Sequence, residues 1–442
     1  MSIDVLIERV RQAAEREAFV WRDTSYSYAW LSDRIIHWRR RLDEAGVESG
    51  TVVCLVGEGS PDTVAALLAL FARGCIAVPL VPSNHLRWRE LCDVVQCQRV
   101  ARIEDGGPDH ELEPCQPRGS HALYDVLRAR RVPGLVLFSS GTTGPSKAAV
   151  HDVSRLLRKF VKRRHDLRTL AFMPFDHIGG QDTILYAISN GSCLILSDDR
   201  SPDGVCRAVE RHRVEVLPVV PTFLTLLALS QAYRRYDLSS LKFVTYGAEL
   251  MSQVVLNKCP EMFPGARLLQ KYGATEVGTL RSASRSSDSL WVRIGGEGYQ
   301  TRVVDGMLQI KAEAAMLGYL SAPSPFTDDG WFVTRDCVEA DGEFVRFLGR
   351  ESDIINVGGR KVFPGHVEDV IRQLPGVADV TVFGQPNPIF GQVVCARVSL
   401  AVPQDAKLFT SALKRHCMDR LPDYQVPVMV TIEGPPTNQC AP

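Results

Sequence analysis

The segment from Leu137 to Asp152, LFSSGTTGPSKAAVHD, concentrates the residue types that bind phosphate. Four hydroxyl side chains and two glycines fall within six residues, and a lysine follows: Ser139, Ser140, Gly141, Thr142, Thr143, Gly144 and Lys147. Glycines let backbone N–H groups approach an anion closely, while hydroxyls and the lysine add donors and positive charge. A flexible surface turn is the structural alternative. The composition of this segment favours a phosphate-binding loop.

The loop does not match the signature of P-loop NTPases. That signature requires Gly-Lys followed by Ser or Thr. Here Gly144 is followed by Pro145 and Ser146, and Ala148 follows the lysine. The loop therefore predicts phosphate binding of another kind.

The segments on either side predict how the loop is held. GLVLF (Gly134–Phe138) before it is an apolar run typical of a buried strand. SRLLRKFVKRRH after it places four apolar residues on one face of a predicted helix: Leu156, Leu157, Phe160 and Val161. The expected layout is strand, loop and helix, in which the helix N-terminus helps to bind the anion.

Three more segments carry groups that suit a nucleotide. KYGATEVG (Lys271–Gly278) supplies the Thr275 hydroxyl and the Glu276 carboxylate, a hard oxygen ligand for Mg²⁺. WFVTRDCVEADG places Asp336 after a short apolar run, where its carboxylate is suited to accept hydrogen bonds from ribose hydroxyls. FLGRESDIINVGGRKVF contains Arg350 and, further on, a glycine turn.

Each of these residues also has an ordinary structural explanation. Asp336 fits a turn, Arg350 fits a surface cation, and Tyr272 fits a core aromatic residue. The case for a nucleotide site depends on the four segments occurring together and in this order.

In this order the segments resemble the motifs of the adenylate-forming superfamily, which includes acyl- and aryl-CoA synthetases, peptide-synthetase adenylation domains and luciferases. The resemblance extends over nearly the whole chain, including the early segments YSYAWLSDRI and VVCLVG. It implies a ligase that uses ATP and Mg²⁺ to convert a small-molecule carboxylic acid into an acyl-adenylate, with release of pyrophosphate. A thiol then takes the acyl group, either coenzyme A or the phosphopantetheine arm of an acyl carrier protein.

The resemblance also implies a role for each motif residue. Ser140 to Gly144 and Lys147 hold the β- and γ-phosphates, and Ser139 belongs to the same ATP-binding set. Thr275 contacts the α-phosphate, and Glu276 binds the metal. Asp336 binds the ribose hydroxyls, Arg350 contacts ribose and phosphate, and Tyr272 lies beside the adenine. The catalytic set is Thr275, Glu276, Lys147 and Arg350.

The acyl pocket is predicted in the same way. MPFDHIGGQ (Met173–Gln181) resembles a pocket wall, and His177 falls where many acyl-CoA ligases carry histidine; a satisfied core histidine is the alternative. YGAEL supplies Tyr246, Gly247 and Ala248 to the pocket, together with Gly273. Asp176 resembles the aspartate that holds an amino group in relatives that activate amino acids. Its distance from Gly191 fits the acyl-ligase register better, which disfavours an amino-acid substrate.

The end of the chain departs from the family pattern. Relatives end with Pro-x-Thr-x-x-Gly-Lys, and that lysine offsets negative charge during adenylation. Alignment of Pro435 and Thr437 places Cys440 at the glycine and Ala441 at the lysine. A truncated or substituted chain, a different lysine in the role, or a protein that does not form adenylates are all open. Two further alternatives are an acceptor other than a thiol, such as an amine, and a non-catalytic protein that binds nucleotide or acyl-adenylate.

Smaller departures are also present. His366 replaces the first glutamate of the usual Pro-x-Glu-Val-Glu motif, while Glu368 remains. Neither this change nor the Gly-Pro-Ser-Lys order of the phosphate loop removes a phosphate contact.

The elements that position these motifs predict a mixed α/β fold. A strand, a helix (Ser60–Gly74) and a second strand, CIAVPLV, are typical of parallel α/β structure, with Ser60 as helix cap and Gly74 as terminator. From Leu290 onward the sequence predicts mostly β-strands. Asp305-Gly306 and Asp341-Gly342 there predict hairpin turns. After Gly349, VEDVIRQLPG and the segment Asp405–Leu421 predict helices of a small α+β unit.

These elements, together with the resemblance, define two expected domains. Residues 1–349 form a large domain of layered α/β subdomains with a small β-rich subdomain. Residues 350–442 form a small, mobile C-terminal α+β domain. The resemblance places the hinge near residues 350–353, at Ser352, and the glycine turn at Gly358-Gly359 in a thiol tunnel.

Composition excludes several classes of function. The 442 residues contain 51 basic and 51 acidic side chains, so the formal net charge is zero. Neither nucleic acid nor an anionic membrane is an expected partner. The chain has no apolar run long enough to span a bilayer. The charged N-terminus instead predicts a short helix with Val5, Leu6 and Val10 on one face.

Twelve cysteines are spread along the chain. Only Cys92 and Cys97 are close in sequence, and their spacing is not a zinc or redox signature. We interpret them as reduced thiols of a cytoplasmic protein.

Overall fold

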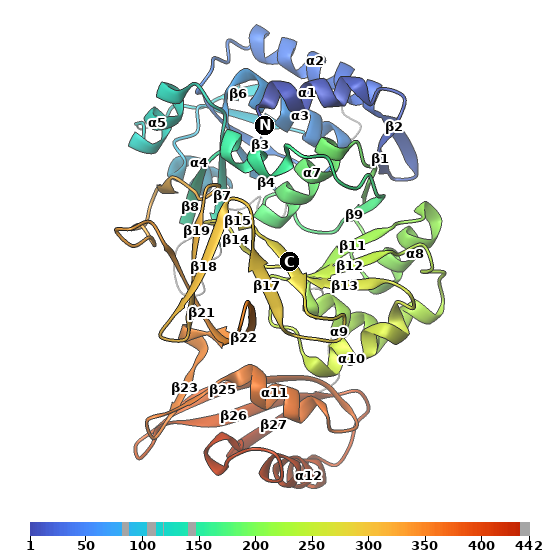
Figure 1. The fold of residues 1–442 in the computed structure, drawn as a ribbon, viewed down its shortest axis with the longest axis vertical. Helices are drawn as coiled ribbons and strands as arrows, with labels where there is room; N and C mark the ends of the chain where they lie inside the picture. The colour runs from blue at the N-terminus through green and yellow to red at the C-terminus, as the bar shows by residue number, and fades with distance from the viewer. Residues whose placement is uncertain (82–87, 104–111, 118, 140–146, 434–442) are drawn as a thin grey trace.

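The computed structural model describes residues 1–81, 88–103, 112–117, 119–139 and 147–433 (Figure 1). Two seven-stranded sheets dominate the N-terminal part of the chain. The first sheet has the order β13-β12-β11-β9-β10-β1-β2, parallel except for the β1–β2 hairpin. Its strands are β1 Glu17–Trp21, β2 Thr24–Ser27, β9 Thr169–Ala171, β10 Leu194–Leu196, β11 Val216–Val219, β12 Phe243–Tyr246 and β13 Arg267–Gln270.

The second sheet has the order β20-β8-β7-β4-β3-β5-β6. Its strands are β3 Val52–Val56, β4 Ile76–Leu80, β5 Arg99–Arg102, β6 Leu112–Pro114, β7 Gly134–Ser139, β8 Lys147–Asp152 and β20 Gly318–Tyr319. The predicted strand–helix–strand unit is present, because β3 and β4 are parallel and joined by α3 (Pro61–Arg73). The Ser60 hydroxyl accepts a hydrogen bond from Thr63 N at 3.3 Å, and Gly74 ends the helix with φ of 80°.

Helices form three layers around these two sheets. Four helices lie between the sheets and share one apolar core with both: α1 Ile3–Gln12, α2 Tyr28–Glu44, α3 and α7 Ile178–Asn190. The outer face of the first sheet packs against α8 Pro202–His212, α9 Pro221–Ser230 and α10 Gln253–Met262. The outer face of the second sheet packs against α4 Trp88–Val94 and α5 Ala122–Arg130. The result is five alternating layers, as the layered α/β prediction requires.

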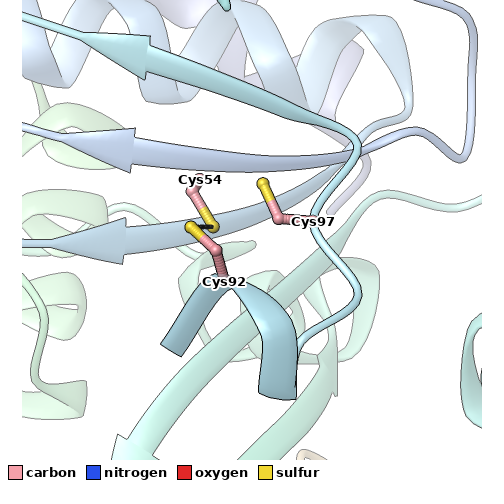
Figure 2. Close-up of side chains that lie close together, drawn as sticks. All are labelled: Cys54, Cys92 and Cys97. Carbon is pink, nitrogen blue, oxygen red and sulfur yellow. Dashed lines mark hydrogen bonds between the residues drawn. The ribbon is translucent and has the colours of Figure 1, made fainter. Parts of the chain in front are cut away.

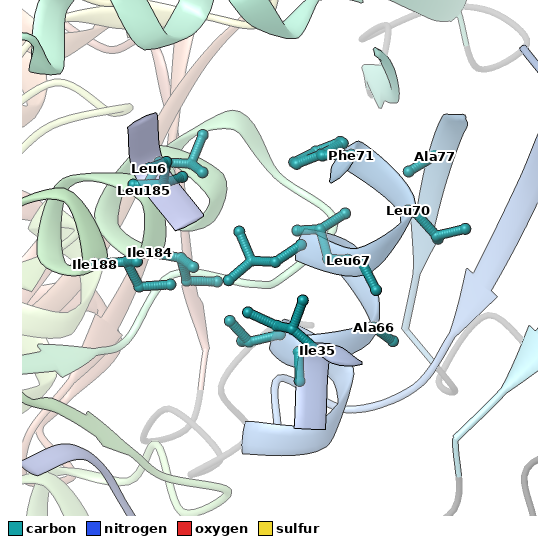
Figure 3. Close-up of a cluster of buried hydrophobic side chains, with 14 of the residues drawn as sticks. Leu6, Ile35, Ala66, Leu67, Leu70, Phe71, Ala77, Ile184, Leu185 and Ile188 are labelled. Carbon is teal, nitrogen blue, oxygen red and sulfur yellow. The ribbon is translucent and has the colours of Figure 1, made fainter. Parts of the chain in front are cut away.

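Alternate residues of β3 face different layers. Val53 and Leu55 enter the core between the sheets, whereas Val52, Cys54 and Val56 face α4 and α5. On that outer side Cys54 lies beside Cys92 and Cys97 (Figure 2). In the core between the sheets, leucines and isoleucines of α1, α2, α3 and α7 meet, Leu67 and Ile184 among them (Figure 3).

The β-rich part of the chain forms a six-stranded antiparallel sheet of order β16-β17-β22-β21-β19-β18. Its strands are β16 Arg281–Ser284, β17 Val292–Gly295, β18 Tyr299–Val304, β19 Met307–Ala312, β21 Phe332–Asp341 and β22 Phe344–Arg350; a small ladder, β14 Gly273–Ala274 with β15 Gly278–Thr279, precedes it. Both predicted hairpins are present. The first turn has positive φ at Asp305 and Gly306, 50° and 75°, as a tight two-residue hairpin requires.

The C-terminal unit is a five-stranded sheet with two helices, at the bottom of Figure 1. Its elements are β23 Ile355–Val357, β24 Arg360–Val362, α11 Pro364–Arg372, β25 Val377–Asn387, β26 Gly391–Leu400, α12 Ala406–Met418 and β27 Met429–Glu433. It has its own apolar core, which includes Val362, Ile371 and Leu413. A short 3₁₀ turn, Glu351–Asp353, connects it to β22. The two-domain division at residues 349 and 350 stays a prediction, although the sheets separate at this point.

The helix expected after the phosphate loop is wrong. Ser139 pairs with Lys147, so the loop joins two antiparallel strands, β7 and β8. Ala148, Ala149 and Val150 are fully buried because β8 is flanked by β7 and β20. Helix α6 begins only at Val153 and has four residues, followed by a 3₁₀ turn over Leu157–Phe160. A helix dipole therefore does not contribute at the loop.

Two smaller expectations about apolar faces also need correction. Val161 follows the 3₁₀ turn and is exposed, so it shares no helical face with Leu156, Leu157 and Phe160. Val5 of α1 is exposed as well; Ile3 and Ile7 join Leu6 and Val10 on the buried face. In the part of the chain that the structure describes, no helix has the length and apolarity needed to cross a membrane.

The core between the sheets generates a stability prediction. Leu67 of α3 is fully buried at its centre, so Leu67→Ala removes packed atoms and leaves a cavity. We expect a loss of about 2–5 kcal/mol in the free energy of unfolding, measured by urea denaturation. Ile36→Ala on the adjoining helix α2 is the control, because Ile36 is 53% exposed. Equal effects of the two substitutions would contradict the assigned core.

Candidate active site

Asp336, Tyr272 and Arg350 form one hydrogen-bonded cluster. The Tyr272 hydroxyl donates to Asp336 Oδ2 at 2.6 Å, and Arg350 Nε lies 3.4 Å from Asp336 Oδ1. The Tyr272 ring stacks on Phe347, with centroids 4.9 Å apart and an angle of 6° between the planes. Three of the four sequence motifs contribute, and the structure brings their residues together. Asp336 is therefore not an isolated turn residue, and Arg350 is not an unpaired surface cation.

The pairing of β21 with β22 explains this arrangement. Asp336 lies directly opposite Arg350 in the ladder. The next pair is Cys337 with Gly349, but the pair after it is Val338 with Phe347. The register therefore shifts by one residue, and β22 has one extra residue, Leu348, at this point. In a regular strand, residues 347 and 350 would point to opposite faces. The bulge places Phe347 and Arg350 on the same face, toward Tyr272 and Asp336.

Burial sets the charge balance of the cluster. Desolvation raises the pKa of Asp336, against the lowering effects of the Tyr272 hydrogen bond and the Arg350 charge. Burial also raises the pKa of Tyr272, and the nearby Asp336 carboxylate adds to that increase. Arg350 keeps 55% of its side chain exposed, whereas Asp336 exposes 15%. The carboxylate thus lies at the base of the cluster, with an accessible cation at its rim.

A second set of contacts links Glu276, through Tyr319, to Lys147 at the start of β8, the strand that follows the phosphate loop. The Tyr319 hydroxyl on β20 donates to Glu276 Oε1, and the Lys147 ammonium lies 5.5 Å from the centre of the Tyr319 ring. Burial raises the pKa of Tyr319, and the Glu276 carboxylate contributes to the same direction. Strand β20 reaches this position by pairing with β8, Tyr319 opposite Ala149. Tyr319 positions Glu276 relative to Lys147.

The donor chemistry here fits Mg²⁺. Within the part of the chain that the structure describes, Tyr319 engages Oε1 of Glu276 and leaves Oε2 as a hard anionic ligand. Mg²⁺ in phosphate sites binds through one or two carboxylates, with phosphate oxygens and water completing its shell. The remaining predicted loop residues, Ser140 to Gly144, lie outside the described residues.

The backbone is closely packed at the residues predicted to form the acyl pocket. A Cβ on Gly247 would lie 2.5 Å from the Lys271 carbonyl oxygen, and one on Gly273 would lie 3.0 Å from Thr279 Cα. Ala248 has φ of 69°, a left-handed conformation that costs a non-glycine residue on the order of 1–2 kcal/mol. Tyr246 is buried at the end of β12. These contacts fix the ends of two neighbouring strands beside Tyr272.

His177 is not a satisfied core histidine. It lies at the start of α7, exposes 55% of its side chain, and its Nδ1 is 2.8 Å from Asp176 Oδ1. The structure therefore excludes the core alternative, and the pocket role of His177 stays a prediction.

The sequence did not predict that Lys271, which lies against Gly247 of the predicted acyl pocket, is a largely buried cation. Burial lowers the pKa of Lys271, with Lys159 and Arg164 acting in the same direction and Asp182 opposing them. Lys159 pairs with Asp182 and donates to the Thr279 carbonyl at 3.0 Å. The one signal in the sequence was a lysine inside the glycine-rich motif KYGATEVG. Tyr319 and Phe347 were also missed, since each reads as an ordinary apolar residue of a strand.

The predicted hinge residue Ser352 follows Arg350 by two residues, and the predicted tunnel glycines lie in the C-terminal unit. Ser352 is exposed within the 3₁₀ turn, and its hydroxyl donates to Asp353 at 2.8 Å. Gly358 and Gly359 form the exposed β23–β24 turn, with φ of 57° and 80°. Their roles in rotation and thiol access stay predictions. Ala441 lies outside the described residues.

A cavity of about 250 Å³ separates the C-terminal unit from α9 and the start of α10. Its lining carries both signs of charge, including Glu249, Arg346 and Glu368. Gln253 N donates across it to Asp369 at 3.3 Å. Among the described residues, this hydrogen bond joins α11 of the C-terminal unit to α10 of the large part of the chain.

Two family models match the chain. The model described as AMP-binding enzyme matches residues 6–103 and 92–310, and that of the AMP-binding enzyme C-terminal domain matches residues 366–434. The chain belongs to the AMP-binding enzyme family, the adenylate-forming superfamily whose motifs it carries.

Relatives cover most of the chain at modest identity. An indoleacetate–CoA ligase of Aromatoleum aromaticum is 26% identical, over 91% of this chain and 88% of the relative. A 2-succinylbenzoate–CoA ligase of Bacillus cereus is 25% identical, over 96% and 92%. The family and ligase class expected from the motifs are confirmed.

Solved structures share the fold. The amide bond synthetase McbA from Marinactinospora thermotolerans superposes with a TM-score of 0.78, at 22% identity, over 98% of this chain and 96% of that one. The o-succinylbenzoate CoA synthetase of Bacillus subtilis, in complex with its acyl-adenylate intermediate, has a TM-score of 0.77 at 22% identity, over 97% and 94%. The mixed α/β prediction is confirmed.

The raised pKa of Asp336 predicts a gain in stability on its neutralisation. A carboxyl whose pKa is raised on folding stabilises the protein while protonated, and that contribution is lost as the pH rises through the folded-state pKa. Asp336→Asn keeps an acceptor for Tyr272 and removes the buried charge. We expect its free energy of unfolding at pH 7 to equal or exceed that of the wild type, and the difference to vanish below the ordinary value of 3.8. Asp328→Asn at an exposed carboxylate is the control, and a pH-independent loss of stability in Asp336→Asn would contradict the assignment.

Proposed function

We propose that the protein activates a small carboxylic acid with ATP and Mg²⁺ and transfers the acyl group from the adenylate to coenzyme A. The observation that carries this proposal is the convergence of Tyr272, Asp336 and Arg350 in a chain of the AMP-binding family. The names of the relatives support an acid–CoA ligase, several of them with aromatic acids. A carrier-protein thiol is the less supported acceptor, and a cytoplasmic location is part of the proposal.

The described side chains fit the steps of adenylation. Asp336 accepts hydrogen bonds from the ribose hydroxyls and fixes the nucleoside, while Tyr272 presents a ring face beside the base. Arg350, exposed at the rim, reaches ribose and phosphate. Lys147 and Thr275 orient the phosphates for attack by the substrate carboxylate on the α-phosphorus, with pyrophosphate as leaving group. Bound to Glu276, Mg²⁺ would neutralise phosphate charge in this step.

An amine acceptor is the second candidate. It rests on the fold that the chain shares with an amide bond synthetase, a likeness that concerns the fold alone. The two candidates differ only in the second half-reaction, so a panel of acids screened for pyrophosphate release identifies the acid, and product analysis with coenzyme A or amines identifies the acceptor.

Glu276→Gln tests the metal role. The amide keeps an oxygen for the Tyr319 hydrogen bond but loses the anionic ligand, so charge neutralisation weakens in the transition state. We expect pyrophosphate release at saturating substrates to fall by roughly 10²–10³-fold, the typical effect of removing one preorganised electrostatic group. Glu297→Gln on the exposed surface is the matched control. Turnover near the wild-type value in Glu276→Gln would remove Glu276 from the metal site.

Ala441→Lys tests the departure at the end of the chain. If the alignment is correct, restoring the lysine should raise the rate of adenylation by roughly 10²–10³-fold and leave thiol transfer from pre-formed acyl-adenylate unchanged. Val402→Lys adds the same charge at an exposed position of the C-terminal unit and should change neither rate.

The unmodified chain separates the remaining alternatives. Rapid adenylation without the substitution would show that another cation serves this role. Failure of both half-reactions despite ATP binding would favour a non-catalytic binding protein over the ligase.

A further inference from the structure

Three cysteines from separate segments meet on the outer face of the second sheet (Figure 2). Cys54 is at the centre of β3, Cys92 lies in α4, and Cys97 precedes β5. Their Sγ atoms all lie within 4.8 Å of one another, and those of Cys54 and Cys92 are 3.3 Å apart. Each residue exposes 7% or less of its surface. The cluster is remote in the sequence from every motif of the proposed active site.

The dimensions of the cluster match thiolate coordination. Four sulfurs around Zn²⁺, each about 2.3 Å from the metal in tetrahedral geometry, lie about 3.8 Å from one another. The Cys54–Cys92 separation of 3.3 Å is slightly shorter than this value, and the upper limit of 4.8 Å for all three pairs is slightly longer. A disulfide would need a sulfur–sulfur distance of about 2.05 Å and would join only two of the three. A single ion among them would engage all three sulfurs.

The cluster lies in apolar surroundings that include Val52, Val78 and Val100. Unneutralised negative charge is costly in such surroundings, so thiolates buried there require a cation bound among them.

A fourth thiol lies next to the cluster. Cys115 follows β6, its N–H donates to the Gln98 carbonyl at 3.0 Å, and its thiol is near enough to interact with the Cys97 thiol. Cys115 is partly exposed, so this side of the cluster faces the surface. Arg99 lies near Cys115 and offers positive charge to an anionic metal–thiolate group.

We propose that Cys54, Cys92 and Cys97 bind one thiophilic divalent cation, of which Zn²⁺ is the best match, with Cys115 beside the open coordination position. Binding breaks three S–H bonds, forms three metal–sulfur bonds and releases three protons to solvent. Zn²⁺ with three thiolates carries a net charge of −1. The ion joins α4, a helix of seven residues, to the centre of the sheet, so its role is structural.

Linear spacing does not reveal this site. Four residues separate Cys92 from Cys97, at the upper limit of the two to four that commonly separate paired zinc ligands, but the sequence has no second cysteine pair of this kind. The third ligand comes from β3, and only the sheet brings it to the pair.

The test measures metal in the full-length protein. Protein purified without chelators and loaded with one equivalent of Zn²⁺ should retain one ion per chain after desalting. X-ray absorption should show three or four sulfur neighbours at about 2.3 Å. Substitution with Co²⁺ should give sulfur-to-metal charge-transfer absorption in the near ultraviolet. These three measurements use the wild-type chain and do not depend on the folding of a variant.

Cysteine variants then assign the ligands. Cys92→Ser and Cys97→Ser should weaken metal affinity by at least 10-fold, whereas Cys206→Ser and Cys259→Ser, buried thiols of another core, should bind as the wild type does. Absence of retained metal together with absence of the Co²⁺ band overturns the proposal. A Cys54–Cys92 disulfide found by mass spectrometry in the freshly purified protein, or equal metal affinity in all four variants, overturns it as well.

Discussion

The buried carboxylate of Asp336 is the constraint on which the site depends. Desolvation disfavours its charge, so the structure must supply partners, and it supplies them from two elements: the Tyr272 hydroxyl after β13 and Arg350 at the end of β22. These contacts join the end of the first sheet to the β-rich sheet. They also fix the residue that immediately precedes the connection to the C-terminal unit. The Asp336 carboxylate, which would hold a ribose, therefore also fixes the relative positions of the first sheet, the β-rich sheet and the start of the connection to the C-terminal unit.

Closely packed backbone near Asp336 also helps to fix the position of the cluster. Gly247 and Gly273 allow strand ends to approach more closely than any side chain permits, and Ala248 is held in a left-handed conformation. Such strain persists only where surrounding packing over-determines the backbone. Here the packing comes from the layered sheets: apolar cores cover β3 and β7 on both faces and cover β12 on the face of Val244 and Tyr246. Sheet pairing positions Glu276 in the same way. Tyr319 reaches the Glu276 carboxylate because β20 pairs with β8.

The sequence was sufficient where the controlling signal is local. The caps of α3 at Ser60 and Gly74, both hairpin turns and the four motifs could all be read from neighbouring residues. It was insufficient where partners come from distant segments. KAAVHD is a strand because β7 and β20 flank it, and apolar spacing in the next segment suggested a helix that the structure gives only as two short turns. The contacts of Tyr319, the burial of Lys271 and the meeting of Cys54 with Cys92 arise from sheet order and helix packing, which no local pattern encodes.

The bulge in β22 has a consequence for changes in chain length. Between Phe347 and Arg350 the strand carries one residue more than its partner, and this extra residue turns both side chains to the same face. Deleting one residue there would restore a regular ladder and move the guanidinium to the other face, although every motif residue would still be present. An inserted residue in the same stretch would have a similar effect. Comparison of residue types alone would score such a chain as intact. Alignment gaps between Asp336 and Arg350 are therefore more informative about loss of this cluster in related chains than substitutions at the same positions.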